Sequence, residues 1–138
     1  MIKVNRLNTL KLKKSKNLNK VSLEINTLNN EIKKSNDLRN KLINIKEKSN
    51  LEVDYSNSWS IKHKHDFDIK IIQQVSFCQN RVSFLEKELK IAKSKLGNLI
   101  IQKKHIEEKI KSLVAANEKK IEEKQLRDNP NYKKNWWH

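Results

Sequence analysis

One apolar repeat in the second half of the chain constrains the fold more than any other feature. Between residues 75 and 120, positions separated alternately by three and four residues are mostly apolar. The series is Val75, Cys78, Val82, Leu85, Leu89, Ala92, Leu96, Leu99, Lys103, Ile106, Ile110, Leu113, Asn117 and Lys120, and eleven of these fourteen residues are apolar. Such a heptad repeat is typical of a long helix that packs along a partner helix, whereas a strand alternates every second residue.

A second heptad repeat occupies the first half of the chain. It runs through Leu18, Val21, Ile25, Leu28, Ile32, Ser35, Arg39 and Leu42, of which six are apolar. Near Leu38 we expect the phase to slip, so that Leu38, Leu42 and Ile45 continue the stripe. Val4, Leu7 and Leu10 recur at helical spacing upstream. The first half therefore predicts one long helix.

The segment between the two repeats has the composition of a turn. It contains Asp54, Ser56, Asn57, Ser58 and Ser60, which are common in turns and at helix N-termini. Elsewhere the chain has a single glycine and a single proline, so it has few other places to turn. We therefore predict an all-α fold, a long antiparallel two-helix coiled-coil hairpin with a short C-terminal tail. Because heptads do not specify orientation, a parallel homodimer is an alternative.

The expected boundaries make one domain of residues 1–138. Helix one covers about residues 4–50, the tip residues 51–62 and helix two residues 63–127. The sequence Asp128-Asn129-Pro130 then ends the second helix, which leaves residues 128–138 as the tail.

The net charge of +15 suggests a polyanionic partner. Residues 1–20 alone contain seven basic residues and no acidic one. However, only four of the 31 basic residues are arginine, the side chain that grips phosphate and guanine best. Lys, Asn and Ile are all encoded by A/T-rich codons, which alone would enrich lysine. A nucleic-acid-binding coiled-coil arm is therefore an alternative function, and steep loss of binding with salt would identify it.

The residues do not suggest catalysis. There is no glycine-rich phosphate loop, no paired-carboxylate cleft and no Ser-His-Asp or Cys-His arrangement, so we expect a non-enzyme without cofactors. His63 and His65 are two residues apart and do not share a helix face, so we expect no metal site. Cys78, the single cysteine, belongs to the apolar repeat of residues 75–120. We expect it to be a small buried apolar residue of a protein in a reducing compartment. Without a signal peptide or membrane span, the expected location is cytoplasmic.

The layout of the chain resembles the type III secretion central stalk family, the YscO and FliJ type with its InvI branch. A basic N-terminal helix, a tip with Trp59, a longer second helix and a short tail follow in the same order. The sharpest local likeness is the segment 125–136. The matching residues there are Leu126, Arg127, Asn131, Tyr132 and Trp136, although Pro130 interrupts the motif and the chain stops after Trp137 and His138.

This resemblance implies a coiled-coil stalk that inserts into the hexameric secretion ATPase, promotes its activity and contacts the export gate membrane protein. It also implies contacts with secretion chaperones, in a virulence or flagellar system, and a cytoplasmic location peripheral to the inner membrane. The implied contact residues at the tip are Tyr55, Trp59 and Phe67. Those at the termini are Lys11, Lys13, Lys14, Leu126, Arg127, Tyr132, Trp136 and Trp137. A prefoldin-like or generic coiled-coil adaptor is a third alternative.

Overall fold

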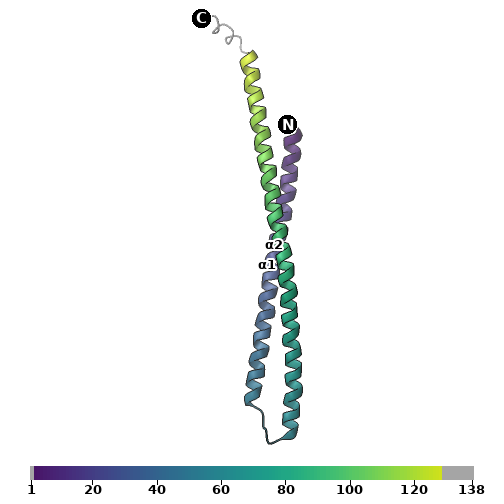
Figure 1. Cartoon of the computed structure of the whole chain (residues 1–138). Helices are drawn as coiled ribbons and strands as arrows, with labels where there is room; N and C mark the ends of the chain where they lie inside the picture. The colour runs from purple at the N-terminus through teal and green to yellow at the C-terminus, as the bar shows by residue number, and fades with distance from the viewer. Residues whose placement is uncertain (1, 129–138) are drawn as a thin grey trace. The chain divides into compact units, whose positions relative to one another are not determined.

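Two helices make up the computed structural model, which describes residues 2–128 (Figure 1). Helix α1 covers Ile2–Leu51 and helix α2 covers Ser58–Asp128, and residues 52–57 connect them. The described residues contain no strand. The prediction of an all-α, two-helix hairpin is thus confirmed.

The chain divides into two compact units, within each of which α1 and α2 run antiparallel. The first, unit 1, is built from residues 2–20 and 96–128, and the second, unit 2, from residues 21–95. Unit 2 contains the connection between the helices.

Unit 2 is held together by one stripe of side chains on each helix. On α2 the most deeply buried residues are Ile71, Cys78, Leu85 and Ala92, which are 4, 4, 4 and 8% exposed. They are seven residues apart and alternate with half-buried Val75, Val82 and Leu89. Val21 of α1, 2% exposed, is the most buried hydrophobic residue of all. The heptad predicted from the sequence therefore is the surface that α2 packs against α1.

Unit 1 continues the same pattern with a thinner apolar layer. Leu99 and Ile106 are 8 and 9% exposed, whereas Leu10, predicted to belong to the apolar stripe of α1, is 41% exposed. Lys11 lies half-buried instead, with its Nζ 3.5 Å from Glu107 Oε1. Lysine can occupy such a position because its aliphatic stem packs while its ammonium reaches the rim.

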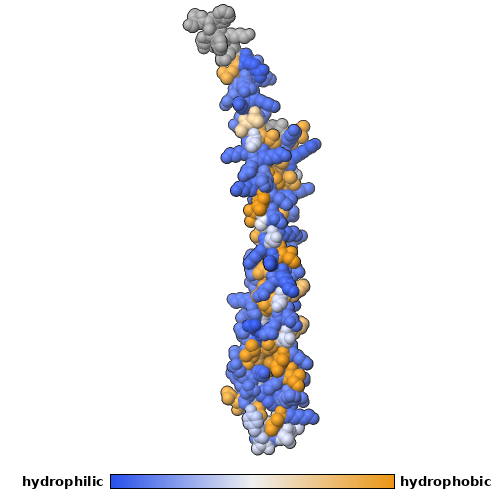
Figure 2. Space-filling model, in the orientation of Figure 1, coloured by the Kyte–Doolittle hydropathy of each residue, from blue (hydrophilic) through white to orange (hydrophobic). Residues whose placement is uncertain are grey.

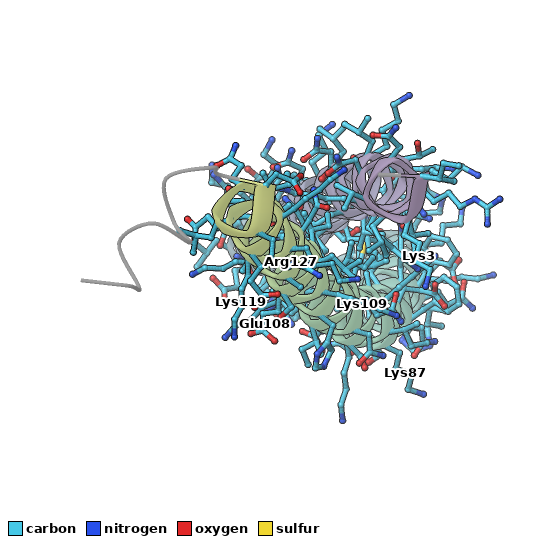
Figure 3. All side chains as sticks on the ribbon, turned by 90° about the horizontal axis from the view of Figure 1, so that it is seen from above. Lys3, Lys87, Glu108, Lys109, Lys119 and Arg127 are labelled. Atoms are coloured by element: carbon cyan, nitrogen blue, oxygen red, sulfur yellow. The ribbon has the colours of Figure 1, made fainter. Side chains whose placement is uncertain are left out.

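The covered part of α2 ends at Asn117. All of the described α2 residues beyond it, 118–128, are exposed, including Lys120, which the sequence had suggested as a seam position. Lys119 and Arg127 are among the exposed charged side chains labelled in the end-on view of Figure 3. Ile2, the first residue of α1 that the structure describes, lies beside Leu113 and Asn117, so the described part of α1 covers α2 up to this level.

The predicted phase slip in α1 is wrong. Leu38 and Ile45 are 51 and 47% exposed, whereas Ser35 is 7% exposed and Arg39 is half-buried. The half-buried positions then continue through Leu42, Lys46 and Ser49 without a break in the seven-residue spacing. A slip would need a stutter in the packing, and the regular seam of α2 provides no matching irregularity. Register with the partner helix thus outweighs local hydrophobicity.

The second helix begins five residues earlier than the predicted residue 63, so the tip is 52–57 rather than 51–62. Asn57 is its N-cap: the side-chain Oδ1 accepts a hydrogen bond from the Trp59 backbone N–H at 3.0 Å. The Asn57 carbonyl accepts the first intrahelical bond, from the Ile61 N–H at 3.1 Å. Because these bonds satisfy backbone groups at the helix start, Trp59 and the two histidines lie within α2.

Adjacent residues of α2 give a direct test of the seam. Leu85 is 4% exposed and Phe84 is 61% exposed. Replacing Leu85 with Ala should lower the free energy of unfolding by about 2–3 kcal/mol, since it removes buried methyl groups from a thin interface. The matched change Phe84→Ala should cost less than about 0.5 kcal/mol. Urea unfolding followed by circular dichroism measures both, and equal costs would contradict the assigned seam.

Candidate functional site

The connection between the helices is organised by Asp54. Its Oδ1 accepts hydrogen bonds from the Ser56 backbone N–H at 3.0 Å and from the Ser56 hydroxyl at 2.6 Å. The Asn57 N–H donates to the Asp54 carbonyl at 3.3 Å, which closes the turn. The Ser56 hydroxyl, and after it the Ser56 backbone N–H, lowers the pKa of the Asp54 carboxyl below its ordinary value. The turn is therefore a defined structure built on an ionised aspartate.

Two aromatic side chains next to this turn are open to solvent. Tyr55 and Trp59 are 74 and 70% exposed. The Trp59 ring stacks on the His63 ring one turn further along α2, with 5.2 Å between ring centroids and 9° between planes. Stacking on one face orients the indole and leaves its other face open, which lowers the entropy lost when a partner covers it. Tyr55 and Trp59 are thus suitable contact residues.

Phe67, the third predicted tip residue, lies apart from them. It is half-buried and follows Trp59 by eight residues on α2, about two turns. Nearby, the Lys64 Nζ forms an ion pair with Asp68 Oδ1, and both side chains are partly buried. These two residues occupy the seam positions that precede Ile71 and Val75 by seven. The apolar seam of unit 2 thus gives way to a charged pair near the connection.

The predicted contact residues near the termini differ in their exposure. Of the three predicted lysines, Lys13 is exposed, whereas Lys11 and Lys14 are half-buried on the side that packs against α2. Leu126, 52% exposed, and exposed Arg127 lie in the last turn of α2. The predicted residues Tyr132, Trp136 and Trp137 lie outside the described residues.

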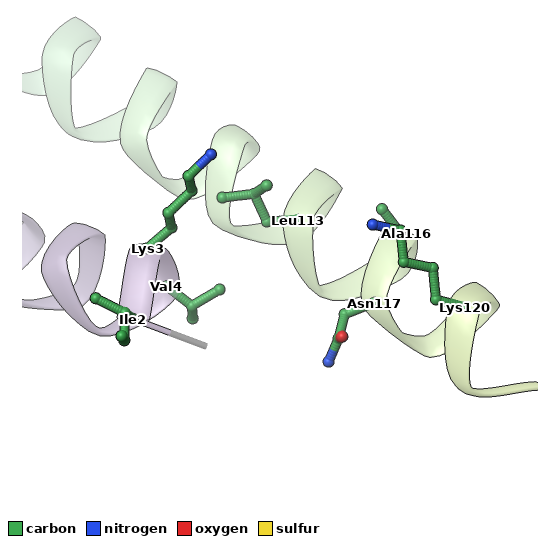
Figure 4. A pocket seen from close by; sticks show the side chains of 7 residues that line it. All are labelled: Ile2, Lys3, Val4, Leu113, Ala116, Asn117 and Lys120. Atoms are coloured by element: carbon green, nitrogen blue, oxygen red, sulfur yellow. The ribbon is translucent and has the colours of Figure 1, made fainter. Parts of the chain in front are cut away.

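A shallow groove lies in unit 1 where α1 begins. Its lining comes from both helices and consists of Ile2, Lys3, Val4, Leu113, Ala116, Asn117 and Lys120 (Figure 4). The groove has a volume of about 400 Å³ and opens widely to solvent. Its ionisable groups, Lys3 and Lys120, are both exposed lysines, so it offers neither a water-poor pocket nor an acid–base pair for catalysis.

Unit 2 also carries regularly spaced exposed side chains that the sequence analysis missed. Large apolar residues at Phe77, Phe84 and Ile91 are 67, 61 and 62% exposed. Lys34, Lys41 and Lys48 form an exposed row on α1 with the same spacing. The seven-residue spacing that the two rows share was visible in the sequence. It was missed because only the positions expected to be buried were followed.

The described residues hold no group of three His, Cys, Asp or Glu side chains placed as metal ligands would be. Over the same range, neither helix has a stretch long and apolar enough to cross a membrane. No known protein family, curated protein or solved structure matches the chain.

The N-cap gives the first prediction for this region. Asn57→Ala should lower the free energy of unfolding by about 1 kcal/mol and speed hydrogen exchange of the Trp59 amide, because that N–H loses its acceptor. Asn57→Asp should retain most of the stability, since aspartate caps equally well. Asn44→Ala, at an exposed position inside α1, is the matched control and should not destabilise. A loss at Asn44 equal to that at Asn57 would contradict the cap.

The turn gives a prediction of pH dependence. Ser56→Ala removes the larger cause of the lowered pKa, so the pKa of Asp54 should rise toward the ordinary aspartate value in a carboxyl-detected NMR titration. Because the folded-state pKa is lowered, the contribution of the turn is present above the unfolded-state pKa. It is lost as the pH falls through the folded-state pKa. An unchanged titration in Ser56→Ala would show that the hydroxyl does not hold the carboxylate.

Proposed function

We propose that the protein is a non-enzymatic stalk of a type III secretion apparatus. It inserts into the hexameric secretion ATPase, promotes ATP hydrolysis and links the ATPase to the export gate. The observation that carries the proposal is where the uncovered contact groups lie. Exposed Tyr55 and Trp59 lie at the connection between the helices, and exposed Leu126 and Arg127 lie in the last turn of α2, while the seam between the helices is covered in both units.

The two-helix packing itself suits a mechanical role. Each helix packs one stripe of side chains against the other helix and presents mostly polar and charged side chains, with some exposed apolar ones, elsewhere. A protein of this kind provides a long surface with contact residues rather than an enclosed active-site pocket. In unit 1, residues 118–128 of α2 are exposed and have no described part of α1 beside them. This part of α2 is therefore available to a partner protein. A stalk needs this combination of internal cohesion and uncovered contact surface.

The resemblance in residues 125–136 specifies which partners these surfaces meet. Leu126 and Arg127, which belong to the matching positions, are exposed in the last turn of α2 and thus accessible to the ATPase. On the same assignment, Tyr55 and Trp59 contact the export gate. Aromatic and arginine side chains of this exposure are the residues that most often dominate protein–protein binding energy.

The test is a titration of the purified protein into the active secretion ATPase encoded in the same genome, with ATP hydrolysis as the readout. We expect a saturable rise at near-stoichiometric protein in about 150 mM salt, where non-specific charge attraction is screened. The variant Leu126→Ala with Arg127→Ala should raise the half-saturating concentration about tenfold, the loss of roughly 1–2 kcal/mol typical of two contact residues.

The matched control is Lys124→Ala with Gln125→Ala, two exposed residues of the preceding turn that are not matching positions. It should saturate as the unmodified protein does, and circular dichroism should show the same helix content for all variants. No stimulation of an ATPase shown to be active would overturn the proposal. Equal loss in both double variants would instead remove Leu126 and Arg127 from the contact.

A further inference from the structure

Two rows of exposed side chains run along unit 2 on different helices. On α1, Lys34, Lys41 and Lys48 are seven residues apart. On α2, Phe77, Phe84 and Ile91 have the same spacing, and more than half of each side chain's surface is open to solvent. Seven residues rise about 10.5 Å along a helix, so both rows repeat at that interval. Exposed hydrophobic residues break the hydrophilic surface of the chain in Figure 2.

An ion pair places both rows on one side of the unit. Glu31 Oε2 of α1 lies 3.8 Å from Arg81 Nη2 of α2. Leu38 and Ile45 follow Glu31 by seven and fourteen residues, so they lie on that same side of α1, and they are 51 and 47% exposed. The flank on which Glu31 and Arg81 meet therefore bears an exposed aliphatic pair beside the seam.

The lysine and phenylalanine rows lie one step further out on each helix. Each lysine comes three residues after a member of the Glu31 row, and Phe84 comes three residues after Arg81. Positions three apart are neighbours on a helix surface. The face thus has a lysine row at its α1 edge, the aliphatic pair inside it and an aromatic row at its outer α2 edge. The exposed polar row of Gln74, Arg81 and Glu88 lies between that aromatic row and the seam. The residues of this face, here called the lysine–phenylalanine face, are Lys34, Leu38, Lys41, Ile45, Lys48, Phe77, Phe84 and Ile91.

The opposite flank has a different character. A groove of about 480 Å³ there is lined by Ile43, Lys46, Glu47, Asn50, Ile71, Ile72, Val75, Ser76 and Gln79. Its charged lining residues are one lysine and one glutamate, so it has no one-sided charge row. The groove on the opposite flank of unit 2 therefore lacks the row of like charge that the lysine–phenylalanine face has.

The exposed apolar residues of this face are not needed for the hairpin. The seam buries Ile71, Cys78, Leu85 and Ala92 and leaves Phe77, Phe84 and Ile91 uncovered. Exposed large apolar side chains that are grouped on one face generally mark an interaction surface. The matching partner is a helix, because only a helix presents side chains with the same seven-residue period to such a row.

We propose that the lysine–phenylalanine face binds an amphipathic helix of another protein that carries acidic residues at heptad spacing along one flank. Its apolar stripe packs between the Leu38–Ile45 pair and the row that contains Phe77 and Phe84. Its Asp or Glu side chains meet Lys34, Lys41 and Lys48 at the α1 edge. The repeat lengths of the acidic and lysine rows coincide, so one register satisfies all three charge pairs.

The charge of the chain argues for this occupant over a second copy. Each copy brings the same lysine row and a net charge of +15, so two copies repel each other. An acidic helix instead gains attraction along the whole row. This inference is independent of the proposed stalk function, since it concerns a face of unit 2 that the ATPase contact does not use.

The probe is a synthetic four-heptad amphipathic helix with Leu on its apolar stripe, Glu along one flank and a fluorescent label. A second peptide carries Lys in place of that flank's Glu. Fluorescence anisotropy with the full-length protein in about 150 mM salt should show saturable binding of the Glu peptide only. The variant Phe77→Gln with Phe84→Gln should weaken binding at least tenfold, and circular dichroism should show its helices intact because both side chains are exposed.

The charge pairs are tested by Lys34→Gln, Lys41→Gln and Lys48→Gln combined. Three exposed pairs of this kind predict a loss of about tenfold, which diminishes as salt rises. The matched control removes three exposed lysines in the rows of α2 that face the opposite groove: Lys62→Gln, Lys90→Gln and Lys93→Gln. The control should retain nearly the full affinity of the unmodified protein.

Four results would overturn the proposal. The Glu peptide could fail to bind, or the Lys peptide could bind as well as the Glu peptide. Sedimentation could show a dimer that the Phe77 and Phe84 changes dissociate, which would assign the face to a second copy. Duplex DNA could compete with the Glu peptide, and DNA binding could depend on the three lysines but not on the two phenylalanines. The lysine row would then be a binding site for phosphate groups.

Discussion

The interaction on which the structure depends is the packing of one side-chain stripe of α1 against one stripe of α2. Among the described residues, the buried hydrophobic ones are Val21, Ile71, Cys78, Leu85, Ala92, Leu99 and Ile106, spread over both units. Burial of each large one contributes roughly 1.5–3 kcal/mol. Because no second layer stands behind the seam, each seam contact matters, and a partner that covers either helix adds to a small margin of stability.

Polar residues within the seam reduce its stability. Ser35 is buried at a position where an aliphatic residue would pack, and among the described residues the buried Arg39 Nε has no hydrogen-bond partner. An unsatisfied buried donor costs about 1–3 kcal/mol. Near the connection, Lys64 and Asp68 hold the next seam positions as an ion pair.

The sequence predicts most of the fold because a heptad repeat is a long-range signal that averages over local exceptions. The series from Val75 to Asn117 is buried or half-buried throughout, as a seam must be. The interpretation failed where it followed hydrophobicity at single residues. Leu38 and Ile45 were predicted to be packed because they are apolar, yet both are exposed. The unbroken register of α2 keeps Ser35 and Arg39 on the side that packs. At the connection, the capping role of Asn57 extends α2 to Ser58, and a period count cannot see such a local hydrogen bond.

The candidate contact residues were harder to predict for a related reason. Periodicity separates covered from exposed positions on one helix but does not say which exposed rows of two helices share a side. That information comes from a contact between helices, and here Glu31 and Arg81 supply it. Once the side is known, the lysine row and the phenylalanine row become one face with a charge pattern and a repeat length. In a two-helix protein, partner specificity therefore resides in rows of side chains on the outer surface, and its repeat length and charge predict the chemistry of what binds there.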